Sequence, residues 1–590
     1  MKQFFKYVLA TFVALVIFSI IGLIFMFGMI GAMSASSSAP TKLEANSVYQ
    51  LDLNGMLVER NEENPFSQII GTMSGQDNTT IGLDEVLANI KKAKTNDKVA
   101  GIYLKTGTMF SGGFASLKEI RDALEDFKKS EKFIVAYGDN FSQGQYYLCS
   151  VADKIIANPQ AMISWQGLAS QTPFFKSALD KLGVQMQVVR VGTFKSAVEP
   201  FITDKMSDAN RKQVTVFVNS IWNTVLNDVS KSRNIEKDSL NAFADKALAF
   251  YSSDEVLNRK MIDTIMYVDG VDAVINKYLK NADDKKVNYV NHSKMTLVPA
   301  GEKFRKDKIA VLYAFGNIVD TGEGMDIITF EKMNKAIEKI SKDDKIKAVV
   351  FRVNSPGGSA FASEQIWRAI SELKKVKPVV VSMGDYAASG GYYISCDADY
   401  IFAQPNTLTG SIGIFGLIPN IEGLTKKIGV SFDGVKTNKH SDMISLNRAF
   451  TPDERDLMQA YVNRGYETFT SRCADGRKMS IDSIKAIAEG RVWTGEDALK
   501  IGLVDELGNL QNAIDFAAKK VNLTDYNTVS YPAKESFMER LLKSLSGEET
   551  KARIAKEYIG AENYKLLQTL KNIENQNFIQ ARMEFDITIK

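Results

Sequence analysis

A serine in a turn of small residues is the first candidate for chemistry in this sequence. Ser389 stands within Ala387–Gly391, after an apolar β-branched run at Val379–Val381 that predicts a buried strand and before an apolar run starting at Tyr392 that predicts a helix. Such a turn can expose a hydroxyl at a helix start, where backbone N–H groups face a developing oxyanion. It works like the G-x-S-x-G elbow but lacks that motif. The alternative is a purely structural turn with a serine N-cap.

A serine nucleophile needs a base, and three residues are candidates. His440 and Lys439 follow Ser389 by about 50 residues, and Lys195 lies far upstream. A histidine would need a carboxylate to orient its ring, and Asp442 is too close in sequence to settle that point. A lysine can serve only if desolvation lowers its pKa by about three units, which corresponds to roughly 4 kcal/mol.

The surroundings of the two lysines differ. Lys439 lies in the polar stretch TNKHSD, which would leave it in water. Lys195 has aromatic and aliphatic neighbours that can desolvate it, namely Phe194, Ala197, Val198 and Phe201. Glu199 would oppose this if it approached the amine, because a nearby carboxylate favours the charged form. The alternative for Lys195 is an ordinary solvated lysine at a helix start.

The elements that must position these residues occur twice. The stretch 138–147, GDNFSQGQYY, matches 384–393, GDYAASGGYY, at five of ten positions, and further matches downstream keep the offset of 246. An internal repeat of this kind indicates two copies of one structural unit. We place the copies at roughly 45–290 and 305–525.

The two copies differ where the chemistry would lie. At the position of Ser389 the first copy has Gln143, which is not a nucleophile. At the position of Lys195 the second copy has Ser441. The serine and the lysine therefore come from different copies.

Each copy alternates strands with helices. In the second copy we predict a strand at Lys347–Val353, a helix at Ser363–Lys374 and a strand at Pro378–Met383. This order implies a parallel sheet with right-handed crossovers, and hence an α/β fold. The predicted division of the chain is a membrane anchor and linker at 1–40, a first repeat with the lysine at 45–300, a second repeat with the serine at 301–525 and a charged helical tail at 526–590.

An uncharged apolar stretch near the N-terminus predicts a membrane anchor. Residues 7–33 contain no charge and number 27, more than the ~20 needed to span a bilayer. The apolar core of a cleavable signal is shorter, at roughly 7–15 residues. Lys2 and Lys6 precede the stretch, so the positive-inside rule places the N-terminus in the cytoplasm and the body outside. We expect one span in contact with membrane lipid.

Composition excludes several classes of function. A net charge of +3 in 590 residues shows no basic excess for nucleic acid. The three cysteines are odd in number and widely spaced, and there are only two histidines, so neither a disulfide framework nor a histidine-rich metal site is expected. No G-x-x-x-x-G-K-[ST] loop occurs. We expect no cofactor and no metal.

Four motifs resemble those of one family. AASGGYY around Ser389, TFKSAVEPF around Lys195, NSPGG at 354–358 and TGSIG at 409–413 are similar to signal peptide peptidase A, also called protease IV, in its long two-domain form. The resemblance covers nearly the whole chain. It implies two tandem Clp protease/crotonase-like domains after a single transmembrane helix. It also implies a Ser–Lys dyad in which Ser389 is the nucleophile and Lys195 the general base.

The same resemblance assigns supporting residues and a setting. It implies that Ser411 holds the amine of Lys195, and that the N–H of Gly390 forms an oxyanion hole with Gly357 or Gly358. It implies a homo-oligomer, commonly a tetramer, in the inner membrane, whose catalytic domains face the periplasm and degrade cleaved signal peptides and other apolar peptides. The alternatives are an inactive binding or scaffold protein on the same fold and an acyl-CoA enzyme, against which export argues because CoA is cytoplasmic.

Overall fold

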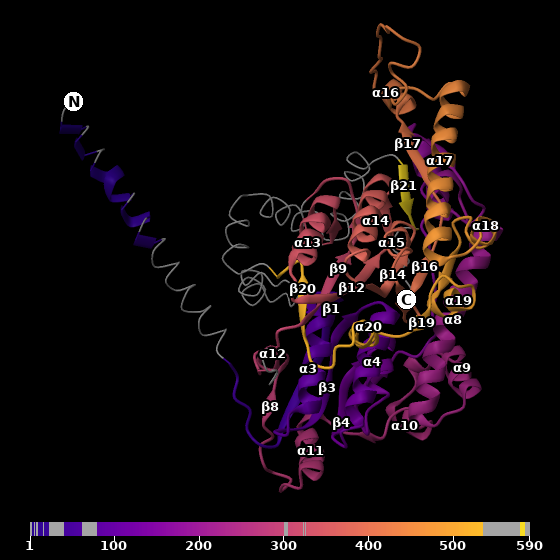
Figure 1. Ribbon diagram of the computed structural model, residues 1–590. Coiled ribbons are helices and arrows are strands. Elements are labelled where there is room, and N and C mark those ends of the chain that lie inside the picture. The colour runs from indigo at the N-terminus through magenta and orange to yellow at the C-terminus, as the bar shows by residue number, and fades with distance from the viewer. Residues whose placement is uncertain are drawn as a thin grey trace.

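Two sheets, one from each copy, form the centre of the molecule; the first is parallel, and the second is parallel except for the antiparallel pair of Leu408–Gly410 with Val492–Thr494. The computed structural model describes residues 40–61, 80–299, 305–322, 324, 326–534 and 579–583, with scattered residues between 3 and 22. In Figure 1 the sheet of the first copy, coloured indigo to magenta, lies below the sheet of the second copy, coloured pink to orange.

The sheet of the first copy is parallel throughout its described pairs, in the order β2-β1-β3-β4-β5-β7 with β8 beside β1. Its strands are β1 (Ser47–Val58), β2 (Thr80–Gly82), β3 (Val99–Ser111), β4 (Phe133–Phe141), β5 (Lys154–Ile163), β7 (Thr264–Ile265) and β8 (Tyr289–Val290). The helices of this copy include α3 (Leu83–Thr95), α4 (Phe114–Lys128), α5 (Gln143–Cys149), α9 (Lys237–Asp245), α10 (Ser253–Asn258), α11 (Val271–Leu279) and α12 (His292–Thr296). Apolar periodicity explains the packing, since the buried residues of α3 recur at helical spacing.

The sheet of the second copy has the order β18-β16-β14-β12-β9-β20, with β15 beside β14 and β19 beside β15. Its strands are β9 (Lys308–Phe315), β12 (Ile346–Ser355), β14 (Val379–Ala388), β15 (Tyr400–Ala403), β16 (Leu408–Gly410), β18 (Val492–Thr494), β19 (Glu506–Leu507) and β20 (Asn527–Tyr531). Helices α13 (Phe330–Lys342), α14 (Ala360–Lys374) and α20 (Leu510–Lys520) pack against it. The predicted strand–helix–strand unit is confirmed, and each element is longer than predicted.

A third sheet joins the two copies, in the order β11-β10-β13-β21-β17-β6. Its strands are β6 (Gln185–Arg190), β10 (Asn317–Ile318), β11 (Ile327–Ile328), β13 (Gly357–Ser359), β17 (Phe415–Asn420) and β21 (Ile579–Arg582). Strand β6 belongs to the first copy and pairs antiparallel with β17 of the second. This pairing carries the segment after β6 into the second copy.

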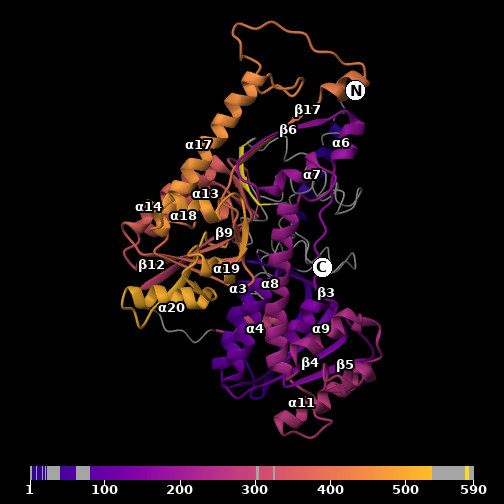
Figure 2. The same cartoon turned by 90° about the vertical axis from the view of Figure 1, so that its right-hand side faces the viewer.

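Two long helices contact strands where the two copies meet. Helix α8 (Asp208–Arg233) packs against β18, and α17 (Pro452–Arg477) packs against β6 and β17. Both are seen along their length in Figure 2. Each begins with a hydroxyl N-cap, from Ser207 in α8 and from Thr451 in α17, which satisfies a backbone N–H of the first turn. Helix α8 belongs to the first copy, and its contact with β18 therefore joins it to the second copy.

A buried ionic cluster lies between the two copies. The fully buried guanidinium of Arg352 donates to Glu59 at 2.5 Å and to Glu119 at 2.7 Å. Next to it, the carboxylate of Asp385 accepts from the backbone N–H and the hydroxyl of Ser116. Burial raises the pKa of Glu119 to about 6. Removing one partner from such a pair leaves an uncompensated buried charge, so the cluster fixes how the copies dock.

Two predictions about the ends of the chain have different outcomes. The helical tail at 526–590 is wrong at β20 and β21, which are strands; in β21 the apolar Ile579 and Ala581 alternate with polar residues, a period of two that favours a strand. At the other end, the described residues include no helix that is long and apolar enough to cross a membrane. Much of the predicted anchor at 7–33 lies outside the described residues and stays a prediction.

Candidate active site

Ser389 lies at the junction of β14 and the short helix α15 (Gly390–Tyr393). Its backbone has φ 54° and ψ −113°, a conformation that non-glycine residues rarely adopt. The N–H of Ser389 donates to the carbonyl of Gly410 in β16, and its carbonyl accepts from the N–H of Tyr393 in α15, so β16 and α15 hold the turn. The hydroxyl makes no capping bond to the helix. Strain of this kind persists only where the surroundings impose it, and it is common at reactive residues.

Lys195 reaches Ser389 from the other copy. After β6 the chain turns toward the second copy and continues into the short helix α7 (Glu199–Ile202). The lysine is 1% exposed. Its Nζ lies 2.7 Å from Ser389 Oγ, 2.9 Å from the carbonyl oxygen of Ser411 and 3.0 Å from Ser411 Oγ. The structure therefore brings together the serine, the lysine and the predicted orienting serine.

A neutral lysine amine, the form that acts as a base, can make these contacts. The two N–H groups of such an amine can donate to the carbonyl and the hydroxyl of Ser411, whose own hydroxyl can donate to the carbonyl of Gly490 at 3.3 Å. The lone pair is then available for the hydroxyl proton of Ser389. Burial disfavours the charged form of an amine. A base positioned within hydrogen-bond reach of a hydroxyl is what nucleophilic catalysis by serine requires.

Apolar packing and close backbone approach keep water from the lysine. Ala197 and Val198 pack against Phe415 of β17. The backbone of Gly490 lies directly over the lysine stem, since a Cβ there would be 2.6 Å from Lys195 Cβ. Gly490 also has φ +76°, so this position needs glycine for two reasons. The predicted desolvation by the TFKSAV segment thus depends on partners from the second copy.

The carboxylate of Glu199 is held at the start of α8. It accepts from the hydroxyl of Ser207 at 2.6 Å, from the backbone N–H of Ser207 at 3.1 Å and from the side-chain amide of Asn210 at 3.0 Å. These bonds fix the carboxylate in a network of neutral donors. The network also anchors the segment that follows Lys195.

Gln213 of α8 is a positioning residue that the sequence did not reveal. Its amide donates to the carbonyl of Phe194 at 3.1 Å and to the hydroxyl of Ser196 at 2.8 Å, the two neighbours of the lysine. Its carbonyl oxygen accepts from the backbone N–H of Val492 in the second copy. One glutamine in an amphipathic helix gives no sequence signal, because its role depends on a tertiary contact.

The structure does not bring the rival bases to Ser389. Lys439 is 71% exposed in its side chain and pairs with Asp453 at 2.5 Å. His440 is 35% exposed and its Nε2 lies 3.2 Å from the same carboxylate, near the start of α17. The hydroxyl of Ser389 is bonded to Lys195 instead.

The three glycines of the predicted oxyanion hole lie together. A Cβ on Gly357 would be 2.6 Å from the backbone nitrogen of Gly390, and a Cβ on Gly358 would be 1.9 Å from the carbonyl oxygen of Ile318. The N–H of Gly357 donates to the hydroxyl of Ser355 at 3.1 Å. Of the two alternatives, Gly358 is therefore the better partner for Gly390.

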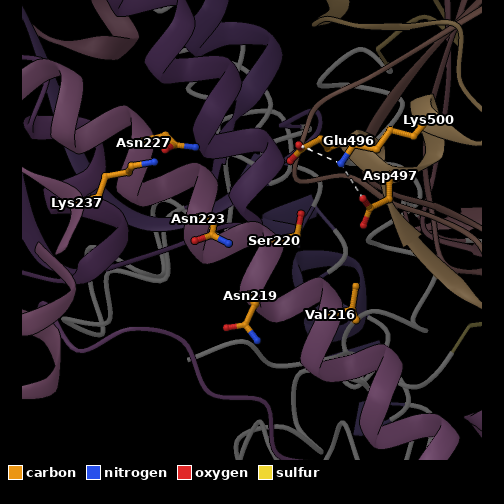
Figure 3. A pocket seen from close by; sticks show the side chains of 9 residues that line it. All are labelled: Val216, Asn219, Ser220, Asn223, Asn227, Lys237, Glu496, Asp497 and Lys500. Atoms are coloured by element: carbon orange, nitrogen blue, oxygen red, sulfur yellow. Dashed lines mark hydrogen bonds and ion pairs between the residues drawn. The ribbon is translucent and has the colours of Figure 1, made fainter.

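Two hollows differ in their relation to this site. The larger, of about 500 Å³, lies between α8 and α19 (Gly495–Lys500) and is lined mainly by polar side chains, with Lys500 bonded to Glu496 and Asp497 (Figure 3). None of the predicted catalytic residues lines it. The smaller, of about 190 Å³, lies at the boundary of the copies and is lined in part by Pro356 and Met583, next to the glycines.

A serine hydroxyl paired with a buried lysine amine, beside backbone N–H groups, defines a serine hydrolase site. Residues 126–283 and 371–524 match peptidase family S49, one range in each copy, and the chain belongs to this family. It is 36% identical over 533 residues to "Protease 4" of Salmonella typhi, covering 87% of this chain and 85% of that protein. It is 32% identical over 465 residues to "Serine protease SPPA, chloroplastic" of Arabidopsis thaliana, covering 77% and 68%.

The chain is thus a serine peptidase with two S49 repeats. The resemblance to protease IV that the motifs indicated is confirmed by these relatives. Among solved structures, a ClpP1 mutant from Listeria monocytogenes aligns with 35% of this chain and 94% of its own at 16% identity and a TM-score of 0.24. The α/β architecture rests on the sheets described above, and the finer Clp protease/crotonase-like assignment stays a prediction.

Proposed function

We propose that this chain is a membrane-anchored endopeptidase that degrades signal peptides, and other apolar peptides, after their release from exported proteins. In this proposal Ser389 is the nucleophile, Lys195 is the general base and Ser411 orients the amine. Gly358 and Gly390 donate to the oxyanion. The observation that carries the proposal is the 2.7 Å hydrogen bond between Lys195 Nζ and Ser389 Oγ inside a buried site.

The proposed reaction has two halves. Ser389 Oγ attacks the peptide carbonyl while Lys195 takes the hydroxyl proton, and the oxyanion that forms is stabilised by the backbone N–H groups. The lysine then gives its proton to the leaving amine, and an ester to Ser389 remains. Water, deprotonated by the same lysine, attacks the ester and frees the serine.

The name of a relative supports the proposed substrate class, and the apolar run near the N-terminus supports the proposed membrane setting. A relative from Enterococcus faecium, 36% identical over 230 residues, carries the name "Putative signal peptide peptidase SppA". The apolar run at 7–33 is long enough to anchor the chain beside peptides that remain in the bilayer. We expect a homotetramer in the inner membrane with its catalytic domains in the periplasm. Protease accessibility in spheroplasts and light scattering in detergent test these two points.

A fluorophosphonate probe tests the catalytic assignment. The full chain in detergent should be labelled at Ser389 and should cleave a fluorogenic apolar peptide, and Ser389→Ala should lose both properties while eluting at the same size. A chain that is never labelled and never cleaves would favour the alternative of a binding or scaffold protein. His440→Ala should behave like the wild type. Loss of activity in His440→Ala, with Lys195→Ala unharmed, would assign the base to the histidine.

A further inference from the structure

One face of α8 forms a wall of the larger hollow, of about 500 Å³ (Figure 3). The α8 residues that line the hollow recur at the spacing of a single helical stripe, namely Val216, Asn219, Ser220, Asn223 and Asn227. A helical stripe that faces a neighbouring element is usually apolar, whereas this one holds three asparagines. Asparagine is a weaker helix former than alanine, lysine or glutamate, because its side chain competes for backbone hydrogen bonds. The three asparagines therefore indicate a role for this face other than helix stability.

The carboxamides of these asparagines are open to a ligand. All three residues are exposed. Asn219 donates to the carbonyl of Thr215 at 2.8 Å, one turn earlier in the same helix, and its oxygen stays available. Among the described residues, the side chains of Asn223 and Asn227 have no hydrogen-bond partner. Each of these carboxamides can offer both a donor and an acceptor.

The charges that line the hollow cancel. On the wall opposite α8, Lys500 of α19 is bonded to Glu496 at 3.3 Å and to Asp497 at 3.1 Å. With Lys237 of α9, the lining holds two lysines and two carboxylates, so its formal net charge is zero. No aromatic ring on which a sugar could stack is found among the described lining residues. These groups match a neutral ligand in which donors and acceptors alternate, as they do in a peptide backbone.

The spacing of the asparagines matches an extended peptide. Residues four apart in an α-helix are separated by about 6 Å along the axis. Every second residue of an extended chain recurs at about 6.6 Å, and these residues present their N–H and C=O groups on the same side. The mismatch adds up to only about 1.2 Å from Asn219 to Asn227, and the broad terminal torsion of asparagine can absorb it. About four residues of extended backbone span the three asparagines.

Helix α8 connects this face to the catalytic residues. Near the start of the helix, Gln213 bonds to both neighbours of Lys195. On its buried face, Phe217 belongs to one apolar cluster with Ala388, the residue before the nucleophile. Asn219 follows Gln213 by about 9 Å along the helix axis. A peptide that is cleaved at Ser389 must therefore be long if it is also to reach the asparagines.

We propose that the asparagine face of α8 (Asn219, Asn223 and Asn227) is an exosite that holds the extended backbone of a polypeptide substrate at a distance from the cleaved bond. This rests on the proposed function, because the bound peptide is the substrate of the same dyad. The carboxamides pair with the N–H and C=O groups of alternate substrate residues, so binding does not depend on the side chains of the substrate. The exosite gives the enzyme a preference for long, unfolded peptides, since only these have free backbone groups over this length.

Peptide-length kinetics on the full chain in detergent test the proposal. The wild type should cleave a fluorogenic peptide of about 20 residues, the length of a signal peptide, with a kcat/KM about tenfold higher than that for a peptide of about six residues. A triple variant with Asn219→Ala, Asn223→Ala and Asn227→Ala should lose most of this preference through a higher KM for the long peptide. Asn463→Ala on α17 is the matched control, because it removes an exposed helical asparagine outside the hollow, and it should keep the preference.

The outcomes of these kinetics separate this inference from the proposed function. A wild type without a length preference, or a triple variant that keeps the preference, would overturn the exosite alone. A wild type that cleaves neither peptide would overturn the proposed function. Elution of the triple variant at a different size from Asn463→Ala would overturn the exosite and assign this face to a contact between copies of the chain.

A binding measurement without turnover tests whether the backbone is what the exosite recognises. In the Ser389→Ala background, fluorescence anisotropy should give equal affinities for the long peptide and for a version shuffled outside its central residues. N-methylation of alternate residues far from the central bond removes N–H donors and keeps the side chains. It should weaken binding by about tenfold, and it should have no further effect when the three asparagines are also replaced. Equal binding of the methylated peptide, or displacement of the peptide by an oligosaccharide, would overturn the assignment.

Discussion

The same strand-to-helix turn occurs in both copies, and it is relaxed in one and strained in the other. In the first copy Ser142, at φ −65°, accepts from the N–H of Gln145 in a complete capping box. In the second copy the serine is one residue later in the aligned turn; Ser389 has φ 54° and makes no capping bond. A shift of one residue thus separates a serine that stabilises a helix from one whose hydroxyl is available for chemistry. The turn at Ser389 is therefore locally less stable than the turn at Ser142, and strained backbone of this kind is common at functional sites.

The glycines that follow the preceding strand show the same contrast. In the first copy a Cβ on Gly113 would lie 2.1 Å from the carboxyl group of Asp385, so a side chain of the second copy closes this place. In the second copy a Cβ on Gly357 would meet the carbonyl oxygen of Ala581. The glycine turn at Gly113 therefore packs against a side chain of the second copy, whereas the turn at Gly357 packs against the backbone of strand β21.

Replacing the base should have the largest effect. Lys195→Met keeps most of the side-chain volume but removes the amine, so kcat/KM for a fluorogenic peptide should fall by about 10³-fold or more. Lys439→Met is the matched control, because that lysine pairs with Asp453 at the surface, and its activity should be unchanged. A Lys195→Met enzyme within tenfold of wild type would exclude the lysine as base.

Moving the serine to the first copy tests directly whether the turn alone makes a serine reactive. Gln143→Ser in a Ser389→Ala background places a hydroxyl at the equivalent position of the first copy. It should remain unlabelled by a fluorophosphonate, because the lysine that would activate it lies in the other site. Labelling at residue 143 would mean that the turn alone is sufficient for reactivity.

Substituting the glycines of the two turns should give the next largest effect on activity. Gly357→Ala should lower kcat/KM by about 10- to 100-fold, since φ +100° disfavours alanine and the added Cβ would be 2.6 Å from the backbone nitrogen of Gly390, next to the nucleophile. Gly112→Ala in the first copy should leave activity unchanged, because its Cβ would meet only the side chain of Leu57 at 3.1 Å. Peptide kinetics on both variants, with melting curves for each, separate the two expectations.

The sequence predicted the parts of this site that repeat and missed those that depend on docking. The alternation of strands and helices, the turn at Ser389 and the replacement of Lys195 in the other copy are all visible by comparing the copies. Ser411 came only from the family resemblance, because a serine in a glycine-rich turn has many roles. Gln213 and Gly490 could not be found, since each acts through a contact between segments far apart in the chain.

The strand at 579–582 was missed for a similar reason, while residues 535–578 of the predicted helical tail lie outside the described residues. Charge and helical periodicity dominate the stretch before residue 579, and the five residues 579–583 are too few for a clear strand signal. Their strand conformation comes from the two edges between which they lie, β13 and β17. Tertiary context overrides local preference most easily in short segments.

The ionic cluster between the copies predicts a smaller, pH-dependent effect. Because burial raises the pKa of Glu119 to about 6, from 4.5 in the unfolded chain, the folded protein holds this proton more tightly. Its contribution to stability is fully present below pH 4.5 and is lost as the pH rises through about 6, by about 2 kcal/mol. Glu119→Gln should remove this loss, seen as a smaller change in the urea midpoint between pH 4.5 and 7.5.

A neighbour on the same helix provides the control for that experiment. Glu125→Gln removes one charge from α4 at a partly exposed position, where the carboxylate pairs with Arg121 at 3.4 Å. A pH profile of Glu119→Gln that matches wild type, rather than flattening, would show that the buried carboxyl group does not bind its proton more tightly in the folded state.

The smallest effects test the two turns against each other. Ser142→Ala removes a helix cap and should lower stability by about 1 kcal/mol. Ser389→Gly should raise it by about 1 kcal/mol, because glycine adopts positive φ freely, no cap is lost, and the amine of Lys195 keeps both contacts to Ser411. Ser142→Gly is the matched control and should cost only a few tenths of a kcal/mol. Urea midpoints of the three variants decide the point: if Ser389→Gly is destabilised as much as Ser142→Ala, the turn at the nucleophile is not strained, and the contrast between the copies is one of chemistry alone.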